Sequence, residues 1–275
     1  MGTWEEVIST KINHLAIISD QYSLEGRFYQ SVFGAKTSPD SPPDGPVCFS
    51  DGYVGFNINS RKSGRPAGFD HFGFDVDDLK LTIERIARFD PQLLVLKRPR
   101  SRQYAGYSGH DPDGNNFDLS QTQLENRRDV YAEGEWVQDR TVNHFALRTL
   151  HPKRVAEFYV EVMKLSSTNR QAGDGNYYLT DGRITMVIMP WAITDFSGTG
   201  ITRQGLDHIG FKVESIAAVK KDIKDISERN PHLAPRPFGI GKESAARLEL
   251  AKASCPLGAH YLADPDGVLI DLCEG

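Results

Sequence analysis

The sequence has few of the features that mark secreted or membrane-spanning proteins. Its 3 cysteines, Cys48, Cys255 and Cys273, are odd in number and widely scattered, which predicts neither a disulfide framework nor a zinc-binding cysteine cluster. No apolar run approaches the roughly 20 residues that a membrane span needs. The acidic start, MGTWEEVIST, lacks the long apolar core of a secretion signal. We therefore expect a protein of the reducing cytoplasm that makes no contact with a membrane.

The chain also lacks an excess of basic residues. Its net charge of −5 argues against a nucleic-acid partner, because phosphate binding needs a basic surface. What is present is ordinary for a soluble globular protein: 275 residues, of which 39% are hydrophobic and 25% are charged. This length is sufficient for two ordinary domains.

The sequence contains a repeat within a repeat. The apolar, strand-like segment INHLAIISD at Ile12 matches VNHFALRTL at Val142, and GFDHFGFDVDDL at Gly68 matches GLDHIGFKVESI at Gly205. Each has one histidine and is followed by a helix-like segment. Hairpin patterns with Asp-Gly turns come next, as in CFSDGYVGFNI. The chain thus reads as strand–helix–hairpin modules in the order A, B, A, B.

The two B modules both close on an Asp-Pro-Asp-Gly turn and a strand that carries a carboxylate. DPDGNNFDLSQT begins at Asp111 and DPDGVLIDLCEG begins at Asp264. The polar stretch 124–139 is predicted to link a domain of residues 1–123 to a domain of residues 140–275. The predicted modules span residues 10–63, 67–122, 140–195 and 204–273.

Each repeated histidine is followed two places later by a very small residue. Residues i and i+2 of a strand share a face, so a large side chain there would fill the space beside the imidazole. Four such places predict a concave surface with histidines at its floor. The pairs are His14 with Ala16, His71 with Gly73, His144 with Ala146, and His208 with Gly210.

Two histidines and one carboxylate occur at equivalent places in both halves. A lone strand histidine is typical of a hydrogen-bonded core residue, and an aspartate near a turn is typical of a cap. The repetition instead favours metal binding, because two histidines and a carboxylate leave coordination positions open on non-haem iron or a similar metal. The sets are His144, His208 and Asp271 in the second half, and His14, His71 and Asp118 in the first.

The modules, their strand histidines and the DPDG turns resemble the vicinal oxygen chelate superfamily. This superfamily includes glyoxalase I, bleomycin-resistance proteins, methylmalonyl-CoA epimerase and the type I extradiol dioxygenases, and the four-module length is similar to the last of these. The resemblance implies an α+β fold with four βαβββ modules paired into two tandem domains. Each domain would be a curved mixed sheet enclosing a cavity. Members often pair between chains, so a homo-oligomer is expected.

The extradiol branch implies roles for particular residues of the second half. Its iron ligands correspond to His144, His208 and Asp271, although the family more often has glutamate at the last position. Its diolate-binding tyrosine, ten residues before the carboxylate, corresponds to Tyr261. The family's acid–base histidine has no counterpart between His151 and His208. The neighbouring candidates for that role are His260 and His232.

The second half lacks a residue that the extradiol branch has, whereas the first half has residues that this branch has generally lost. It keeps all three ligand-type residues. These residues either bind a second metal or form a hydrogen-bonded polar cluster. At the place that corresponds to Tyr261 this half has Ser108. That difference favours the second half as the working site. Tyr177, Tyr178 and the strand Met186–Met189 are expected in the core or in the cavity wall.

The resemblance implies an Fe(II)-dependent dioxygenase that cleaves a small aromatic vicinal diol, or a similar bidentate substrate, with O₂. One alternative is a redox-neutral isomerase, epimerase or lyase that uses Zn, Ni, Co or Mn. The aspartate ligand and the missing acid–base histidine favour this alternative. A second alternative is a protein that binds or sequesters a small molecule. The complete ligand sets argue against it.

Overall fold

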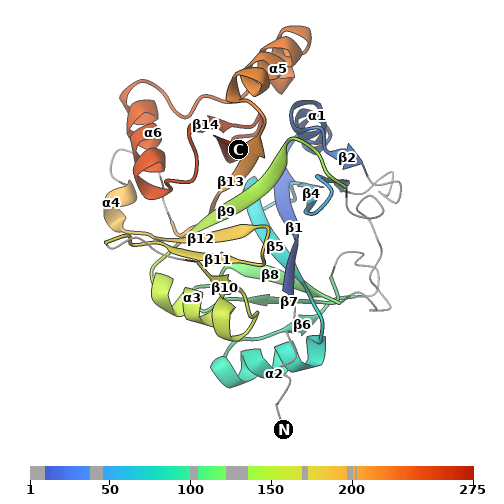
Figure 1. Ribbon diagram of the computed structural model, residues 1–275, viewed down its shortest axis with the longest axis vertical. Coiled ribbons are helices and arrows are strands. Elements are labelled where there is room, and N and C mark those ends of the chain that lie inside the picture. The colour runs from blue at the N-terminus through green and yellow to red at the C-terminus, as the bar shows by residue number, and fades with distance from the viewer. Residues whose placement is uncertain are drawn as a thin grey trace.

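The computed structural model describes residues 10–37, 46–99, 105–121, 136–168, 173–196, 201 and 203–275. Two mixed sheets form its framework (Figure 1). The first sheet has eight strands in the order β2-β3-β4-β1-β5-β8-β7-β6, and the second has seven in the order β10-β11-β12-β9-β13-β15-β14. We call residues 10–121 the first half and residues 136–275 the second half.

The first half contains two modules with the same order of elements. The first is β1 (Thr10–Ser19), α1 (Tyr22–Phe33), β2 (Lys36–Thr37), β3 (Val47–Ser50) and β4 (Gly55–Ser60). The second is β5 (Gly68–Val76), α2 (Leu79–Phe89), β6 (Leu96–Lys97), β7 (Tyr107–His110) and β8 (Asn116–Ser120).

The second half repeats this order until its last module. The third module is β9 (Thr141–Thr149), α3 (Pro152–Glu161), β10 (Ser166–Ser167), β11 (Tyr177–Thr180), β12 (Thr185–Pro190) and the short α4 (Ile193–Phe196). The fourth is β13 (Gly205–Val213), α5 (Ile216–Arg229), η1 (Pro231–Leu233), α6 (Lys242–Ser254), β14 (His260–Ala263) and β15 (Leu269–Glu274). Within its described residues, the helix α6 therefore stands where the other modules have a short strand.

These two sheets, built from four modules, confirm the predicted α+β fold class. The domain bounds stay a prediction, because most of the predicted linker 124–139 lies outside the described residues. None of the described helices is long and apolar enough to cross a membrane.

The modules form their helices because the sequence supplies caps and apolar stripes. Asp78 accepts a hydrogen bond from the Leu81 amide at the start of α2, and Ser215 accepts one from Ala218 at the start of α5. Such N-caps satisfy amides that have no partner inside the helix. In α1 the predicted stripe places Phe28 and Tyr29 in the core.

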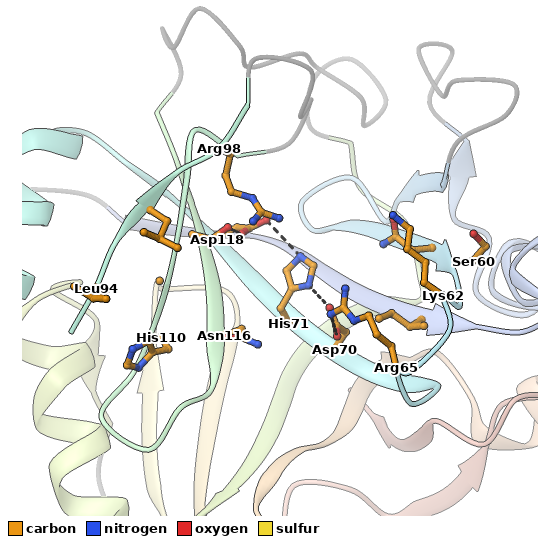
Figure 2. A pocket seen from close by; sticks show the side chains of 15 residues that line it. Ser60, Lys62, Arg65, Asp70, His71, Leu94, Arg98, His110, Asn116 and Asp118 are labelled. Carbon is orange, nitrogen blue, oxygen red and sulfur yellow. Dashed lines mark hydrogen bonds and ion pairs between the residues drawn. The ribbon is translucent and has the colours of Figure 1, made fainter. Parts of the chain in front are cut away.

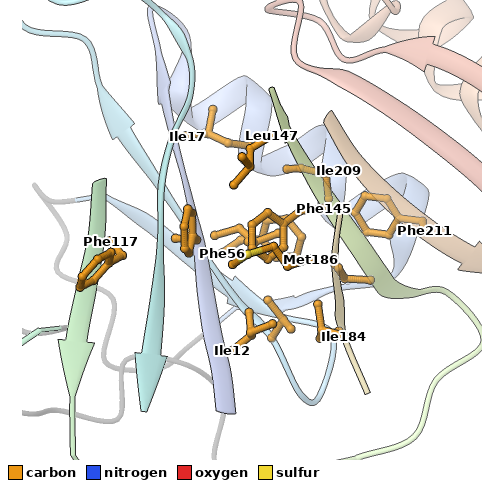
Figure 3. Packing of buried hydrophobic residues seen from close by; sticks show 14 of the residues in the cluster. Ile12, Ile17, Phe56, Phe117, Phe145, Leu147, Ile184, Met186, Ile209 and Phe211 are labelled. Carbon is orange, nitrogen blue, oxygen red and sulfur yellow. The ribbon is translucent and has the colours of Figure 1, made fainter. Parts of the chain in front are cut away.

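One continuous apolar core joins the two halves (Figure 3). The rings of Phe33 on α1 and Phe211 on β13 stack with centroids 3.8 Å apart, and those of Phe72 and Phe145 lie 4.9 Å apart. All four side chains are almost fully buried. Burying an aromatic or aliphatic side chain of this size contributes roughly 1.5–3 kcal/mol. The halves are therefore held together by their helices and sheets, not only by the chain between them.

The DPDG turns also join the halves. The first aspartate of each turn uses one carboxylate oxygen to accept hydrogen bonds from backbone amides of its own turn. Its other oxygen accepts a hydrogen bond from a tyrosine of the opposite half: Tyr159 donates to Asp111 over 3.1 Å, and Tyr29 donates to Asp264 over 2.9 Å. The repeated Phe-Tyr and DPDG segments thus form one reciprocal interface.

The Asp-Gly hairpin turns make a second reciprocal pair of hydrogen bonds between the two halves. Asp51 Oδ2 accepts the amide of Val142, and Asp181 Oδ2 accepts the amide of Ile12, each over 2.8 Å. These amides lie near the starts of β9 and β1, the strands that carry the first histidine of each half. The interface therefore also sets where those histidines lie.

Candidate metal centres in the two halves

Each small residue of the histidine strands lies opposite the histidine of the neighbouring strand. In the antiparallel pair β1–β5, His14 is opposite Gly73 and His71 is opposite Ala16. A β-carbon on Gly73 would lie 2.1 Å from Cε1 of His14, and one on Gly210 would lie 1.9 Å from Cε1 of His144. The spacing in the sequence predicts each glycine beside the histidine of its own strand. The glycine instead makes room for the imidazole across the ladder.

The residue before each histidine is the extra residue of a β-bulge. In the β1–β5 ladder the register skips Asn13 and Asp70, and in the β9–β13 ladder it skips Asn143 and Asp207. A bulge turns a side chain that would otherwise point to the opposite face of the sheet. All four bulged side chains lie against the next residue's imidazole.

These bulged residues determine how each imidazole points. Their side-chain oxygens lie 2.6–2.8 Å from Nδ1 of the following histidine. A proton held on Nδ1 leaves the Nε2 lone pair free, which is the arrangement found around metal-binding histidines. The repeated Asn-His and Asp-His dipeptides carried this signal, and the sequence analysis missed it.

In the first half, His14, His71 and Asp118 meet as predicted, and we call them the first cluster. Asp118 lies on β8, which pairs with β5 so that Asp118 is next to Gly73. Its Oδ2 is 3.4 Å from Nε2 of His71 and 4.0 Å from Nε2 of His14. Ser108 donates a hydrogen bond to Asp118 Oδ1. Three ligand atoms therefore point to one place.

In the second half, His144, His208 and Asp271 also meet as predicted, but Cys255 joins them; these four residues are the second cluster. Asp271 Oδ2 is 3.1 Å from Nε2 of His144 and 3.5 Å from Nε2 of His208. The Cys255 thiol lies 3.9 Å from Nε2 of His144. Cys255 could not be found from the repeats, because it follows α6, an element without a repeat partner among the described residues of the first half.

The charges of the first cluster depend on one another. Burial lowers the pKa of His14 to about 3, and the neighbouring His71 acts in the same direction. Burial also lowers the pKa of His71, but hydrogen bonds to Asp118 and Asp70 outweigh it and raise the pKa to about 9. Burial opposes ionisation of Asp118, while its hydrogen bond with His71 holds its pKa at about 2. The cluster thus keeps its carboxylate ionised in the presence of positive charge.

The second cluster stabilises positive charge more strongly. Burial lowers the pKa of His208, but its hydrogen bond to Asp207 contributes to a net rise to about 10. Burial raises the pKa of the Cys255 thiol, and contacts with His144 and His208 outweigh it to give about 7. A thiol of this kind is a competent metal ligand, because the thiolate is the form that binds.

The first cluster opens into a cavity of about 600 Å³ (Figure 2). His71 and Asp118 are among the residues that line it, with side chains 12% and 10% exposed. Basic and polar side chains make up much of the wall. They include Asn59, Ser60, Lys62, Arg65, Arg98, His110 and Asn116.

The second cluster is more deeply buried than the first. All four of its residues are buried. A cavity of about 350 Å³ next to Arg148 is lined by none of them. Apolar side chains pack around Cys255 instead: Ala146, Tyr178, Val187 and Met189. Neither of these two cavities is lined by the second cluster, and the expectation that the second half is the working site stays a prediction.

Tyr261 lies beside the second cluster. It lies opposite Asp271 in the β14–β15 ladder, as the ten-residue spacing predicts. Its hydroxyl donates to the carbonyls of Cys255 and Gly258, over 2.8 and 3.1 Å. A β-carbon on Gly258 would lie 2.3 Å from Asp271 Oδ2, so only glycine lets this backbone approach the carboxylate. Tyr261 thus holds the loop 255–258 in place next to Asp271.

The other two predicted catalytic residues lie outside both clusters. His260 is half-buried on β14, opposite Leu272, and burial together with Lys220 lowers its pKa. His232 is exposed in η1. Their catalytic roles stay predictions. Tyr178 and the strand Met186–Met189 lie in the core, as expected.

His110 is the histidine that the sequence analysis did not single out. It lies on β7 two residues after Ser108, so both side chains face the same cavity. Its Nδ1 is 2.9 Å from the carbonyl oxygen of Asp111, which fixes the proton on Nδ1 and leaves Nε2 as an acceptor. Its place directly before the DPDG turn was the available signal.

No protein-family model matches the chain, and no curated protein matches it. Solved structures do match it. A Mn(II)-bound glyoxalase from Novosphingobium aromaticivorans has a TM-score of 0.64 at 15% identity, covering 97% of this chain and 82% of that one. The 2,3-dioxygenase LapB from Pseudomonas sp. KL28 has a TM-score of 0.58 at 18% identity, covering 96% and 92%. Homoprotocatechuate 2,3-dioxygenase from Arthrobacter globiformis has a TM-score of 0.61 at 14% identity, covering 97% and 80%.

These likenesses confirm the predicted fold, which the chain shares with solved glyoxalase and dioxygenase structures. The similarity extends over nearly the whole chain and includes both glyoxalase and dioxygenase structures. A single fold that carries several reactions does not identify the reaction of this chain, which must be argued from its own site.

Proposed function

We propose that the protein is a metal-dependent enzyme whose reaction takes place at the first cluster. The observation that supports this is the meeting of two Nε2 atoms and one carboxylate oxygen beside a cavity of about 600 Å³. His14, His71 and Asp118 would hold the ion on one side only. Such a set leaves the remaining coordination positions open to ligands from the cavity.

The charge of the cavity favours an anionic small molecule. A divalent cation and the single carboxylate of Asp118 together leave a net charge of +1. Lys62, Arg65 and Arg98 add positive charge around it. Among the described residues, Arg65 is paired with the carboxylate of Asp70 over 2.9 Å. We infer a substrate that offers two neighbouring oxygens to the metal and carries an acidic group.

The chain's own residues would orient the metal ligands and move one proton. Asn13 and Asp70 keep the protons of His14 and His71 on Nδ1, so both Nε2 atoms face the site. Ser108 holds Asp118 through its second oxygen. A bound metal would lower the pKa of a substrate hydroxyl and polarise it. His110, with Nε2 free to accept, would take that proton as a general base.

For the reaction itself we propose extradiol-type oxidation of an aromatic vicinal diol with O₂ on Fe(II). The open face of the first cluster supports it, because a two-His, one-carboxylate set has room for a bidentate substrate and O₂ together. Two of the similar structures are 2,3-dioxygenases by name.

A redox-neutral isomerase, epimerase or lyase is the second candidate. One observation favours it: the Tyr261 hydroxyl is held by backbone carbonyls, and the matching position in the open cavity is Ser108. The substrate-binding tyrosine of ring cleavers thus has no free counterpart at either place. The Mn(II)-bound glyoxalase among the similar structures is consistent with this second candidate.

One experiment separates the candidates. The protein is purified without oxygen, its metals are measured, and O₂ uptake is followed with catechols that carry or lack an acidic group. Iron with O₂ uptake that His71→Ala abolishes supports the dioxygenase. Another metal without uptake supports the redox-neutral enzyme. Absence of metal at the first cluster would overturn both. A cytoplasmic location and a homo-oligomeric state stay predictions.

A further inference from the structure

The edge strand of the first sheet makes one wall of the cavity beside the first cluster. β6 is the last strand in the order of that sheet, and the amide of Arg98 donates to the carbonyl of Gly106 over 2.8 Å, which extends the β6–β7 ladder to Arg98. Alternate residues of a strand share a face. Leu94, Leu96 and Arg98 therefore present their side chains to the cavity, and all three are among the residues that line it.

The same ladder places this wall next to the first cluster. Leu96 is opposite Ser108 on β7, and Ser108 is opposite Asp118 on β8. Neighbouring strands lie about 4.8 Å apart, so the backbone of Leu96 is about 10 Å from that of Asp118. A small molecule between them would touch the wall and the cluster at the same time.

Arg98 has hydrogen-bonding capacity that no described residue uses. The Nε atom of its guanidinium group is buried and has no hydrogen-bond partner among the described residues. Figure 2 shows the Arg98 side chain pointing toward Asp118. A buried donor without a partner is costly, so it indicates an acceptor that comes from outside the chain. Nε and a terminal nitrogen of a guanidinium group are parallel donors that match the two oxygens of a carboxylate.

The other two cations of the cavity wall are less suited to this role. Arg65 is already paired with Asp70 over 2.9 Å, and its side chain is 51% exposed. Lys62 is exposed as well. Water and salt screen exposed charges, whereas a buried donor binds an anion with less competition from water. Arg98 is therefore the cation that we expect to distinguish an acidic ligand from a neutral one.

Leu94 and Leu96 add an apolar strip to the same wall. Their side chains are 64% and 63% exposed, although they line a cavity. Exposed apolar side chains that gather beside a cavity mark a place where an apolar part of a ligand gains by leaving water. Leu96 is two residues from Arg98, or roughly 7 Å along the strand. One small molecule could therefore contact both.

We propose that Arg98 determines substrate specificity by binding a carboxylate through Nε and one terminal nitrogen, while Leu94 and Leu96 contact the apolar body of the same molecule. The substrate class is then a small organic acid whose carboxylate is joined by a short link to the ring or chain that carries the two neighbouring oxygens. This assignment rests on the proposed function for the place of the reaction, and it adds the residue that binds the acidic group. No covalent bond is made or broken at Arg98.

Binding of aromatic acids without a diol tests the role of Arg98 in the absence of any reaction. Phenylacetate and 3-phenylpropionate are titrated by calorimetry into the full chain as purified, and their neutral amides are titrated in parallel. We expect each acid to bind at least about tenfold more tightly than its amide, because only the acid accepts charge-assisted hydrogen bonds. Arg98→Gln should reduce this preference to less than about twofold. Lys62→Gln, which removes an exposed cation of the same cavity, is the matched control and should keep most of it.

The apolar strip has a different expected signature. Leu94→Ser combined with Leu96→Ser should weaken the acids and the amides alike, by at least about threefold, because it removes apolar contact and no charge. Unchanged binding of the amides to Arg98→Gln would show that this variant is folded. Amide binding that the leucine changes leave unaltered would overturn the role of the strip.

Removing the metal separates this proposal from the proposed function. The preference for acids should survive in the metal-free wild-type chain, because Arg98 and not the metal confers it. A preference that disappears with the metal or persists in Arg98→Gln would overturn the role of Arg98, and so would failure of both acids to bind. Phenyl phosphate that binds more tightly than both acids would overturn the carboxylate class. Failure of the proposed function would appear separately, as missing metal or as turnover that His71→Ala leaves unchanged.

Discussion

The two clusters have the same frame and different surroundings. In both, a bulged Asn-His strand crosses a bulged Asp-His strand, and an aspartate comes from the strand after the DPDG turn. In the first half the remaining side of the cluster is a cavity. In the second half that side is occupied by Cys255 and its loop. The same frame of histidines and aspartate thus occurs in both halves, and the two halves differ in the segment before the last hairpin and in the cavity beside the first cluster.

The largest effect expected from this comparison is on turnover. His71→Ala removes a ligand from the open cluster and should lower turnover by more than about 100-fold, because loss even of a residue that only orients a metal ligand typically costs 10–100-fold. The matched variant His208→Ala, in the second cluster, should retain turnover within about threefold per folded molecule. Steady-state kinetics with metal analysis on both proteins provide the test. The opposite pattern would place the reaction in the second half.

Asp70 and Asp207, the aspartates that directly precede the second histidine of each half, should differ in how much they contribute to stability. Asp207→Asn leaves Arg148, which is 3% exposed, without its nearest carboxylate, and should lower the free energy of unfolding by about 3 kcal/mol. Asp70→Asn affects Arg65, whose side chain is 51% exposed, and should cost less than about 1 kcal/mol. Urea unfolding of the two variants gives both values. Equal losses would contradict the difference in burial.

The halves also differ at the two tyrosine–aspartate contacts of their interface. At the first contact, Asn115 donates a hydrogen bond to Asp111 over 2.7 Å. At the second contact, the residue equivalent to Asn115 is Val268, which has no side-chain donor for Asp264. The buried side chain of Glu25 lies near Asp264 instead. Burial raises the pKa of Glu25, and the nearby carboxylate of Asp264 raises it further. A protonated Glu25 would supply the donor that Asn115 supplies at the other contact.

This arrangement predicts a pH dependence with a definite sign. Above the ordinary glutamate pKa of 4.5 the unfolded chain binds fewer protons at Glu25 than the folded chain does. As the pH rises above 4.5, the contribution of Glu25 to the free energy of unfolding should therefore fall by up to about 1.4 kcal/mol per pH unit. The fall should end when the pH reaches the raised pKa of Glu25 in the folded chain. Glu25→Gln keeps a donor and should remove this slope. Unfolding of both proteins between pH 6 and pH 8 measures the difference, and parallel curves would refute a proton on Glu25.

The smallest effect expected is that of Tyr261→Phe. Losing hydrogen bonds to the carbonyls of Cys255 and Gly258 should lower the free energy of unfolding by about 1 kcal/mol, measured by urea unfolding. Turnover should change less than twofold. A large loss of turnover with unchanged stability would instead support the substrate-binding role that the resemblance implies for Tyr261. Ser108→Ala, at the matching place in the open cavity, is the comparison variant.

Much of the site could be predicted because it depends on short-range patterns. Histidines in apolar strands, small residues two places later and the DPDG turn recur at fixed spacing, and strand periodicity places their side chains. The bulges could not be read in this way, because the residue that is skipped depends on the register of two paired strands. For this reason Asn13, Asp70, Asn143 and Asp207 were missed, although each directly precedes a predicted ligand.

The sequence by itself determined the four modules, the two sets of histidines and aspartates, and the turns that present the aspartates. These are repeated local patterns, and the agreement between the two copies supports the interpretation of each copy. Only the tertiary structure placed a cavity beside the first set. The second set instead meets Cys255, Gly258 and Tyr261, which come from a segment without a repeat and reach the ligands because α6 lies where the other modules have a short strand. Contacts between segments that share no pattern are set by packing, and packing cannot be read from spacing alone.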